Sequence, residues 1–265
     1  MDAIVTAGGI PEPDDALYIY TQGKPKALLE ISGKPMIQWV LEALCAAETI
    51  EQVVVIGLTA DSGVGCEKVK AYLPNRGDLI NNIKAGVEKV LELNPAAEHV
   101  LAVSSDVPGV TAEGINWIVN NAMQTKEDVY YNVISRQTME ARYPNSNRSY
   151  VRLKDVEVCG GDINVIRCQL VKQNDAFWRR LVDARKNALK QAALIGYDTL
   201  ILLLLRWITL EGAVKRVTKR IKVTGRALLC PYAEVGMDVD KPHQFELMRS
   251  DLEQRLKTQK STVPG

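Results

Sequence analysis

The sequence is poor in the residues that build several common kinds of site. It contains only two histidines, His99 and His243, which nearly excludes a metal cage made of imidazoles. Its five cysteines include no CxxC pair, and their number is odd. We therefore expect reduced thiols in a cytoplasmic protein, with neither a zinc site nor a disulfide framework.

Excess charge of one sign and long apolar runs are also missing. The 33 basic and 32 acidic residues give a net charge of +1, which argues against a dedicated nucleic-acid binder. The most apolar run, residues 200–205, is far shorter than the roughly 20 residues of a membrane span. We expect this run to form a core helix, although a homodimer face stays open for it. No basic segment precedes the first strand, so no signal peptide is indicated, and we expect neither a nucleic-acid nor a membrane partner.

The familiar phosphate-binding motifs do not occur, since the chain has neither GxxxxGK[ST] nor GxGxxG. Instead, a short apolar strand ends at Ala7, Gly8 and Gly9, and Lys24 and Lys26 follow a loop. Adjacent glycines let backbone N–H groups approach a phosphate, and lysines supply positive charge. The pattern predicts another way of holding a nucleotide.

Short apolar strands alternate with helical patterns in the first half of the chain. The strands are expected at residues 3–6, 53–57, 100–104 and 130–135, and the helices from Pro35 as the first helical residue, at 80–93 and at 115–123. This alternation predicts an α/β fold with a mostly parallel sheet and a ligand beyond the carboxyl ends of the strands.

The pattern changes after about residue 140, where a polar, turn-rich segment and then a turn entering a strand are expected. Residues 175–221 read as successive helices with Thr209 as an N-cap, followed by a strand near 227–230 and a last helix from about 243. We expect one domain over residues 1–256, with a helical insertion at about 175–222 and a flexible tail at 257–265.

Three aspartates are candidates for metal binding. Asp106 follows an apolar strand, where its carboxylate can bind Mg²⁺ or form an Asx-turn or helix cap before Pro108. Asp238 and Asp240 alternate on an extended segment before Pro242, so the two carboxylates face one side and can chelate an ion or cap a helix. Two acidic centres beside one rim of a sheet favour Mg²⁺ bound to nucleotide phosphates.

These motifs together resemble one known family. Ala-Gly-Gly is followed by Pro25-Lys26-Ala27-Leu28-Leu29-x-Ile31-x-Gly33-Lys34-Pro35-Met36-Ile37, then by Ser105-Asp106-Val107-Pro108 and Asp238-Val239-Asp240-Lys241-Pro242. In this order, over nearly the whole chain, they resemble the MobA-like NTP transferases. The resemblance implies a GT-A-type, Rossmann-like three-layer sandwich. It also implies a nucleotidyltransferase that uses Mg²⁺, an NTP and a small phosphorylated acceptor.

The resemblance assigns roles to particular positions. Ala7, Gly8, Gly9 and Lys24 would contact the nucleotide, Lys26 would be the catalytic lysine on the phosphates, and Asp106, Asp238 and Asp240 would hold Mg²⁺, with Asp106 also catalytic. Asn81, with Asn82 as the alternative, would read the base, unless these amides cap a helix. The acceptor would lie at Gly160, Gly161, Asp162 and Asn164, although the two glycines are equally suited to a turn.

The sequence departs from the family in the loop after the glycines. Many members carry an arginine there in a G-x-[ST]-x-R pattern, whereas residues 10–15 contain three acidic side chains and no basic one. The long loop up to Lys24 is a candidate lid over the substrate. Two alternatives therefore stay open: a glycosyltransferase of the same fold that uses an NDP-sugar, and a nucleotide-binding regulatory protein that has lost catalysis.

Overall fold

The first half of the chain builds the parallel part of a central sheet. The computed structural model describes residues 1–173 and 196–262. Four strands lie side by side and are all parallel, in the order β5 (Val69–Leu73), β4 (Val53–Ile56), β1 (Asp2–Thr6) and β6 (His99–Ser104). In β1, Ala3 and Val5 pack into one core cluster and Ile4 into another, because alternate side chains point to opposite faces. Both faces of β1, β4 and β6 are buried, which explains the apolar runs of these three strands.

The second half adds strands of mixed direction. β10 (Ile163–Arg167) is antiparallel to both β6 and β7 (Val129–Ser135), while β11 (Gly225–Leu229) is parallel to β7. β9 (Glu157–Gly160) and β8 (Val151–Arg152) continue the sheet beyond β7 with antiparallel pairs. The expected α/β fold is confirmed, with a parallel core and an antiparallel extension.

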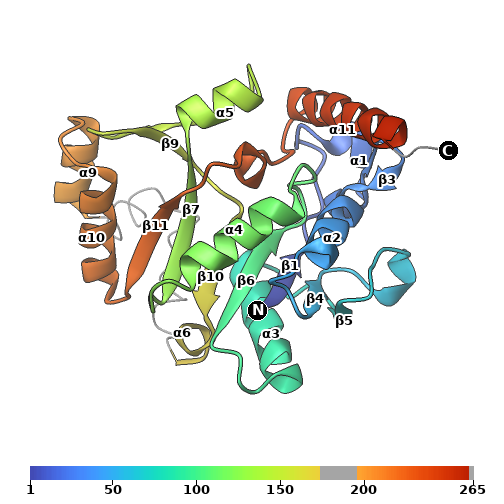
Figure 1. The fold of residues 1–265 in the computed structure, drawn as a ribbon, viewed down its shortest axis with the longest axis horizontal. Coiled ribbons are helices and arrows are strands. Elements are labelled where there is room, and N and C mark those ends of the chain that lie inside the picture. Colours follow the sequence, from blue (N-terminus) through green and yellow to red (C-terminus); the bar gives the residue numbers. More distant parts are fainter. Residues whose placement is uncertain (174–195, 263–265) are drawn as a thin grey trace.

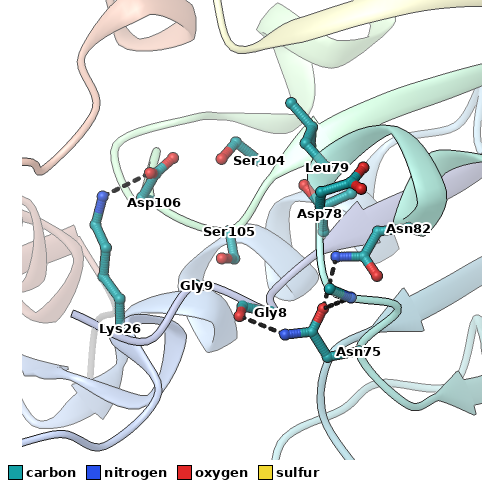
Figure 2. Close-up of a pocket in the computed structure, with 12 residues that line it drawn as sticks. Gly8, Gly9, Lys26, Asn75, Asp78, Leu79, Asn82, Ser104, Ser105 and Asp106 are labelled. Carbon is teal, nitrogen blue, oxygen red and sulfur yellow. Dashed lines mark hydrogen bonds and ion pairs between the residues drawn. The ribbon is translucent and has the colours of Figure 1, made fainter. Parts of the chain in front are cut away.

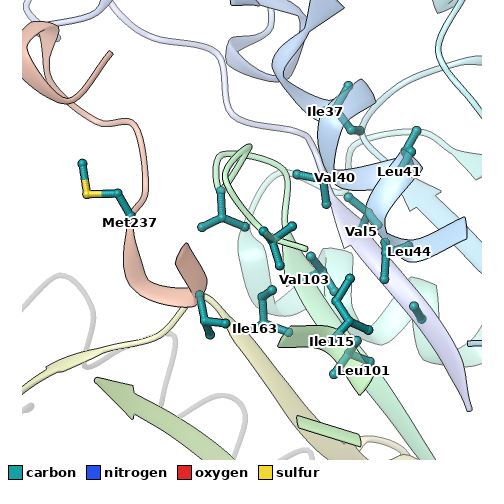
Figure 3. Packing of buried hydrophobic residues seen from close by; sticks show 14 of the residues in the cluster. Val5, Ile37, Val40, Leu41, Leu44, Leu101, Val103, Ile115, Ile163 and Met237 are labelled. Atoms are coloured by element: carbon teal, nitrogen blue, oxygen red, sulfur yellow. The ribbon is translucent and has the colours of Figure 1, made fainter. Parts of the chain in front are cut away.

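Helices cover both faces of the sheet and make three layers (Figure 1). α2 (Met36–Ala46) and α4 (Ala112–Ala122) pack on one face, where Ile37, Leu41 and Ile115 join the larger cluster drawn in Figure 3. α3 (Leu79–Leu93) and α6 (Cys168–Gln173) pack on the other. The long helix α11 (Pro242–Thr262) lies beside α1 (Tyr18–Thr21) and the β2–β3 hairpin (Figure 1).

Short elements connect these layers. They are η1 (Lys26–Leu28), β2 (Glu30–Ile31), β3 (Lys34–Pro35), η2 (Ala60–Ser62), α5 (Arg136–Arg142) and η3 (Ala233–Gly236). Pro35 stands immediately before α2, one position earlier than expected for it. The turn-rich segment after α5 is confirmed, since Asn145 and Asn147 both adopt positive φ, at 63° and 53°. β5 escaped sequence analysis because its residues are only partly buried and include a lysine.

The helical insertion is described from residue 196 on, and the part of it expected at 175–195 lies outside the described residues. α9 (Tyr197–Leu204) and α10 (Leu210–Ile221) are separated by Thr209, whose Oγ1 accepts from the Gly212 N–H at 3.1 Å. The predicted cap is confirmed. The prediction of a core helix at 200–205 is wrong, because Ile201, Leu204 and Leu205 are exposed. A helix that is apolar all round does not reveal in its sequence which side is buried.

Two further expectations need revision. Cys45 and Cys66 form a disulfide, contrary to the expected reduced thiols, while Cys159, Cys168 and Cys230 are free. The pairing follows from packing, because the loop after β4 lies against the end of α2. Gly65 there exchanges two hydrogen bonds with the Gln38 side chain. The last helix also continues over residues 257–262, where a tail was expected. No helix among the described residues is long and apolar enough to cross a bilayer.

Candidate active site

The glycine pair after β1 sits where two strand ends touch. The Ala7 N–H donates to the Ile56 carbonyl at 2.7 Å, which brings the end of β1 against Gly57. Gly57 has φ +105°, and a Cβ on it would collide with the backbone of Gly8. A Cβ on Gly8 would in turn lie 2.7 Å from the Asn75 side chain. These glycines therefore let the loops after β1, β4 and β5 converge.

A cavity of about 630 Å³ opens at this convergence (Figure 2). It lies at the carboxyl ends of β1 and β6 and beside the start of α3, as the strand-end rule predicts. Its lining consists of Thr6, Gly8, Gly9, Lys26, Asn75, Gly77, Asp78, Leu79, Asn82, Ser104, Ser105 and Asp106.

A chain of neutral amide hydrogen bonds forms one wall of the cavity. The Asn82 side chain is buried, its Oδ1 accepts from the Arg76 N–H at 2.7 Å, and its Nδ2 donates to Asn75 Oδ1 at 3.1 Å. Asn75 Nδ2 donates in turn to the Gly8 carbonyl at 2.8 Å (Figure 2). Asn82 thus fixes the loop that holds the glycine pair.

The two asparagines proposed for the base differ in their surroundings. Asn81 is exposed, and its Nδ2 donates to Asp78 Oδ2 at 2.7 Å. Asp78 is the N-cap of α3 and also accepts from the Asn81 N–H at 2.9 Å. Asn81 therefore binds the N-cap residue of α3, close to the capping role that was its alternative, whereas Asn82 lines the cavity.

Lys26 joins the two predicted acidic centres. Its N–H donates to the Gly9 carbonyl, and its Nζ lies 2.7 Å from Asp106 Oδ2 and in contact with Asp240 Oδ1. The Val239 N–H donates to the Asp106 carbonyl at 2.9 Å, which fixes the late segment beside the strand-end loop. Burial lowers the pKa of Lys26, but Asp106 and Asp240 outweigh this effect and raise the pKa above its ordinary value.

Arg148 binds the remaining carboxylates. Its guanidinium contacts Asp238 Oδ1, lies 3.7 Å from Asp162 Oδ2, and donates to the Gly160 carbonyl at 3.3 Å. Asp238 and Asp240 therefore meet different cations, Arg148 and Lys26 respectively. Burial raises the pKa of Asp162 to about 7, with repulsion from Asp106 adding to the shift and Arg148 opposing it.

The segment expected to bind the acceptor combines structural and exposed groups. Gly161 donates to the Asn132 carbonyl at 2.8 Å, and a Cβ on Gly160 would collide with the Tyr131 hydroxyl. The side chain of Asn164 is also engaged in hydrogen bonds within the protein. Its Oδ1 accepts from the Asn132 N–H at 2.8 Å, and its Nδ2 donates to the Gly161 carbonyl. Asp162 is thus the member of this segment that reaches the charged cluster. Tyr131 lies at the same place, and burial, followed by the Asp162 charge, raises the pKa of its hydroxyl.

The long loop after the glycines is docked on the protein. Leu17 and Thr21 are buried, and Tyr20 stacks on Phe245 of α11 with ring centroids 4.8 Å apart. The acidic side chains at positions 12, 14 and 15 are exposed and outside the cavity lining, so they do not face a bound phosphate. Lys24 is exposed as well and lies outside the lining, in contrast to Lys26.

The charge balance of the cluster suits a divalent cation. Asp106, Asp162, Asp238 and Asp240 face Lys26 and Arg148, so the carboxyl groups outnumber the cations by two. Because the pKa of Asp162 is raised to about 7, the excess of negative charge is two when Asp162 is ionised and one when it is protonated. Asp106 Oδ1 is buried and has no hydrogen-bond partner among the described residues. Oxygen ligands of this kind are those that Mg²⁺ prefers, and the donor set therefore fits the ion.

Sequence analysis missed Arg148, Asn75 and Tyr131. Arg148 comes from the polar segment after α5, in which no residue stands out by spacing or by neighbours. Asn75 precedes a glycine turn, a place where asparagine is common for conformational reasons alone. Only the packing of distant segments gives these side chains a place in the site.

Comparisons with known proteins agree with this geometry. A hypothetical transferase from Thermus thermophilus has a similar structure, with a TM-score of 0.80 and 32% sequence identity over 92% of this chain and 98% of that one. A CMP:2-keto-3-deoxy-manno-octonic acid synthetase complexed with CTP gives a TM-score of 0.57 at 15% identity, covering 96% and 99% of the two chains. A 4-diphosphocytidyl-2C-methyl-D-erythritol synthase from Anaerococcus prevotii gives 0.56 at 10% identity, covering 95% of each chain. The two synthases support the fold.

A family model described as a MobA-like NTP transferase domain matches residues 20–220, more than half of the chain. A comparison with curated proteins found no match. The fold and the family match together make this protein a nucleotidyltransferase. Within that class, the chain belongs to the MobA-like NTP transferase family.

Proposed function

We propose that the protein transfers a nucleoside monophosphate from an NTP to a small phosphorylated acceptor, such as a sugar, polyol or cofactor phosphate, with Mg²⁺ as cofactor. The observation that carries this proposal is the position of Lys26. It is held between Asp106 and Asp240, which lie 80 and 214 residues later in the chain, and it lines the same cavity as the glycine pair Gly8 and Gly9.

The donor nucleotide fits the cavity side of this cluster. Backbone groups at Gly8 and Gly9 lie where phosphates can approach closely, and Lys26 supplies positive charge beside them. Asn75 and Asn82 hold the wall against which the nucleoside would rest. Asp106 and Asp240 would hold Mg²⁺, which supplies charge neutralisation for the phosphates when bound. Asp238, engaged by Arg148, is the remaining ligand candidate.

The acceptor fits the side of the cluster with Arg148, Asp162 and Tyr131. An arginine is well suited to bind a phosphate through two parallel hydrogen bonds. In the reaction, an oxygen of the acceptor phosphate attacks the α-phosphorus, the new P–O bond forms, and the bond to pyrophosphate breaks in line with it. The residues act by positioning and charge neutralisation, and no covalent enzyme intermediate is needed.

Pyrophosphate release tests this function directly. The protein is incubated with each NTP, MgCl₂ and a panel of sugar, polyol and cofactor phosphates, and we expect pyrophosphate and a nucleoside diphosphate-linked product with one NTP. An NDP-sugar series serves as the control for glycosyl transfer. Absence of NTP binding together with absence of pyrophosphate contradicts the proposal. Tight, Mg²⁺-independent binding without product would instead indicate a regulatory nucleotide site.

The metal ligands can be distinguished by paired substitutions. We expect Asp106→Asn and Asp240→Asn to abolish Mg²⁺-dependent turnover, because each removes a carboxylate from the Lys26 cluster. Asp238→Asn should retain more activity, since it removes the partner of Arg148. Titration of turnover against MgCl₂ separates the two cases, and equal losses in Asp238→Asn and Asp240→Asn would contradict this division.

A further inference from the structure

A stripe of apolar side chains on α9 faces solvent. Tyr197, Ile201, Leu204 and Leu205 are all exposed and follow one another at helical spacing, so they form one continuous face. Leu204 is 83% exposed, and Trp207, just beyond the helix, is 69% exposed. The opposite side of α9 packs on the core through Leu202 and Leu203. Exposed apolar groups gathered in this way usually mark a contact site.

Basic side chains lie next to this stripe. α10 packs against α9, and the Arg216 guanidinium holds Asp198 of α9 at 3.0 Å. Lys215, Lys219 and Lys222 follow helical spacing on α10 and are all exposed. Residues 196–226 contain seven basic and two acidic side chains, a net charge of +5, in a chain whose net charge is only +1. The positive charge is therefore concentrated beside the apolar stripe.

We propose that α9 and α10 dock the protein on an anionic lipid surface. Aliphatic side chains and a tryptophan can enter the headgroup region, while lysines and arginines beside them attract anionic headgroups. The expectation of no membrane partner was based on the absence of a span, and surface docking needs none. Figure 1 places α9 and α10 at one end of the long axis, opposite α1 and α11, so docking there leaves the other end free.

The same observations disfavour two other occupants. A second copy in a two-fold dimer would bring each patch against itself and place the lysines of α10 near one another. A nucleic acid would satisfy the lysines, but its phosphates would leave Ile201 and Leu204 against a polar backbone. An anionic bilayer matches both the charge and the aliphatic stripe.

Vesicle sedimentation tests the proposal with the full chain. We expect the protein to co-sediment with vesicles of phosphatidylcholine and phosphatidylglycerol, weakly with phosphatidylcholine alone, and less as salt is added. Lys215→Ala with Lys219→Ala should lower the partition coefficient roughly tenfold or more, because each cation near an anionic surface contributes favourably. Leu204→Glu with Trp207→Glu should lower it by at least a similar factor.

Matched controls keep the test decisive. Ile19→Glu changes a side chain that is 67% exposed on α1, and Lys70→Ala with Lys126→Ala removes two exposed lysines elsewhere. These variants should bind vesicles as the wild type does, and circular dichroism checks that all variants fold. The proposal is overturned if the wild type ignores mixed vesicles or if the controls lose binding equally. It is also overturned if the patch variants instead lose concentration-dependent dimers or duplex DNA binding.

Discussion

The two sides of the cleft are held together by different forces. On the donor side, the cavity wall is a series of neutral hydrogen bonds from Asn82 through Asn75 to the Gly8 carbonyl. On the acceptor side, Arg148 pairs with Asp238 and lies near Asp162. Lys26 with its two aspartates stands between them. Each neutral hydrogen bond contributes modestly to the stability of its own loop. Each buried charge, in contrast, is stable only while its oppositely charged partners are present.

The difference indicates that the two sides would bind their phosphates in different ways. In the proposed function, the wall from Asn82 to the Gly8 carbonyl brings no charge of its own, so Lys26 and Mg²⁺ would meet the charge of the substrate there. The acceptor side holds its arginine in ion pairs that an incoming phosphate can replace. Substitutions that change only one of the two sides therefore test the comparison.

The largest effect is expected at the boundary between the two sides. Lys26→Ala removes the cation shared by Asp106 and Asp240, and we expect kcat to fall roughly 10²- to 10³-fold, as when a charge-stabilising donor is lost. Lys24→Ala is the matched control, because this neighbouring lysine is exposed outside the cavity lining. Steady-state pyrophosphate release measures both, and a similar loss in Lys24→Ala would show that the loop rearranges over the substrate.

Arg148→Ala tests the acceptor side. It leaves Asp238 and Asp162 without their cation, and we expect a loss of about 3 kcal/mol in the free energy of unfolding together with a raised acceptor KM. Urea denaturation and acceptor titration measure the two effects. Arg152→Ala serves as the control, since its partner Glu157 is at the surface, where ion pairs contribute little to stability. An unchanged acceptor KM would remove Arg148 from the acceptor site.

Asn82→Ala tests the neutral wall of the donor side. Removal of this buried amide leaves the Arg76 N–H without its partner and takes one of the hydrogen bonds from Asn75 Oδ1, so we expect a loss of about 1 to 3 kcal/mol and weaker NTP binding. Asn81→Ala removes an exposed capping amide and should have a smaller effect on both. Calorimetric titration with the preferred NTP compares them, and the reverse order would assign the base contact to Asn81.

The last expected effect is on the pH dependence of stability and comes from the titration of Asp162. Its pKa is raised to about 7 in the folded protein, so between its ordinary value and about 7 the folded state binds more protons than the unfolded state. Stability should therefore fall as the pH rises through this window and level off above it. Asp162→Asn should flatten this part of the profile, measured as the free energy of unfolding against pH. An unchanged slope would place the effect in other groups.

Much of the fold follows from local chemistry. The buried parallel strands β1, β4 and β6 are apolar runs, and caps such as Thr209 are visible in the sequence. In the second half, strands near β7, β10 and β11 were also expected, whereas β8 and β9 escaped because they are short and partly exposed. The position of α9 on the surface and the Cys45–Cys66 bond depend on neighbours that no local pattern specifies.

The residues of the candidate site likewise fall into those that the sequence predicts and those that it does not. Lys26, Asp106 and Asp240 were found because charged groups at strand ends converge by a general rule of parallel sheets. Arg148 was missed because it comes from an irregular segment, and its partners lie 14 and 90 residues later in the chain, at Asp162 and Asp238. Asn81 and Asn82 show a finer limit, since one residue of helix phase decides which amide enters the cavity.

The hydrogen bond from the Val239 N–H to the Asp106 carbonyl also has a consequence for folding during synthesis. The ribosome makes Gly8, Lys26 and Asp106 well before Asp240, which follows Asp106 by 134 residues. The segment that carries Asp240 is anchored by α11, where Arg255 donates to the Gly109 carbonyl at 2.7 Å. Because domains fold during synthesis from the N-terminus onward, the nascent chain lacks its complete charged cluster until this late segment has been made. The proposed catalysis therefore has to wait for α11 to dock.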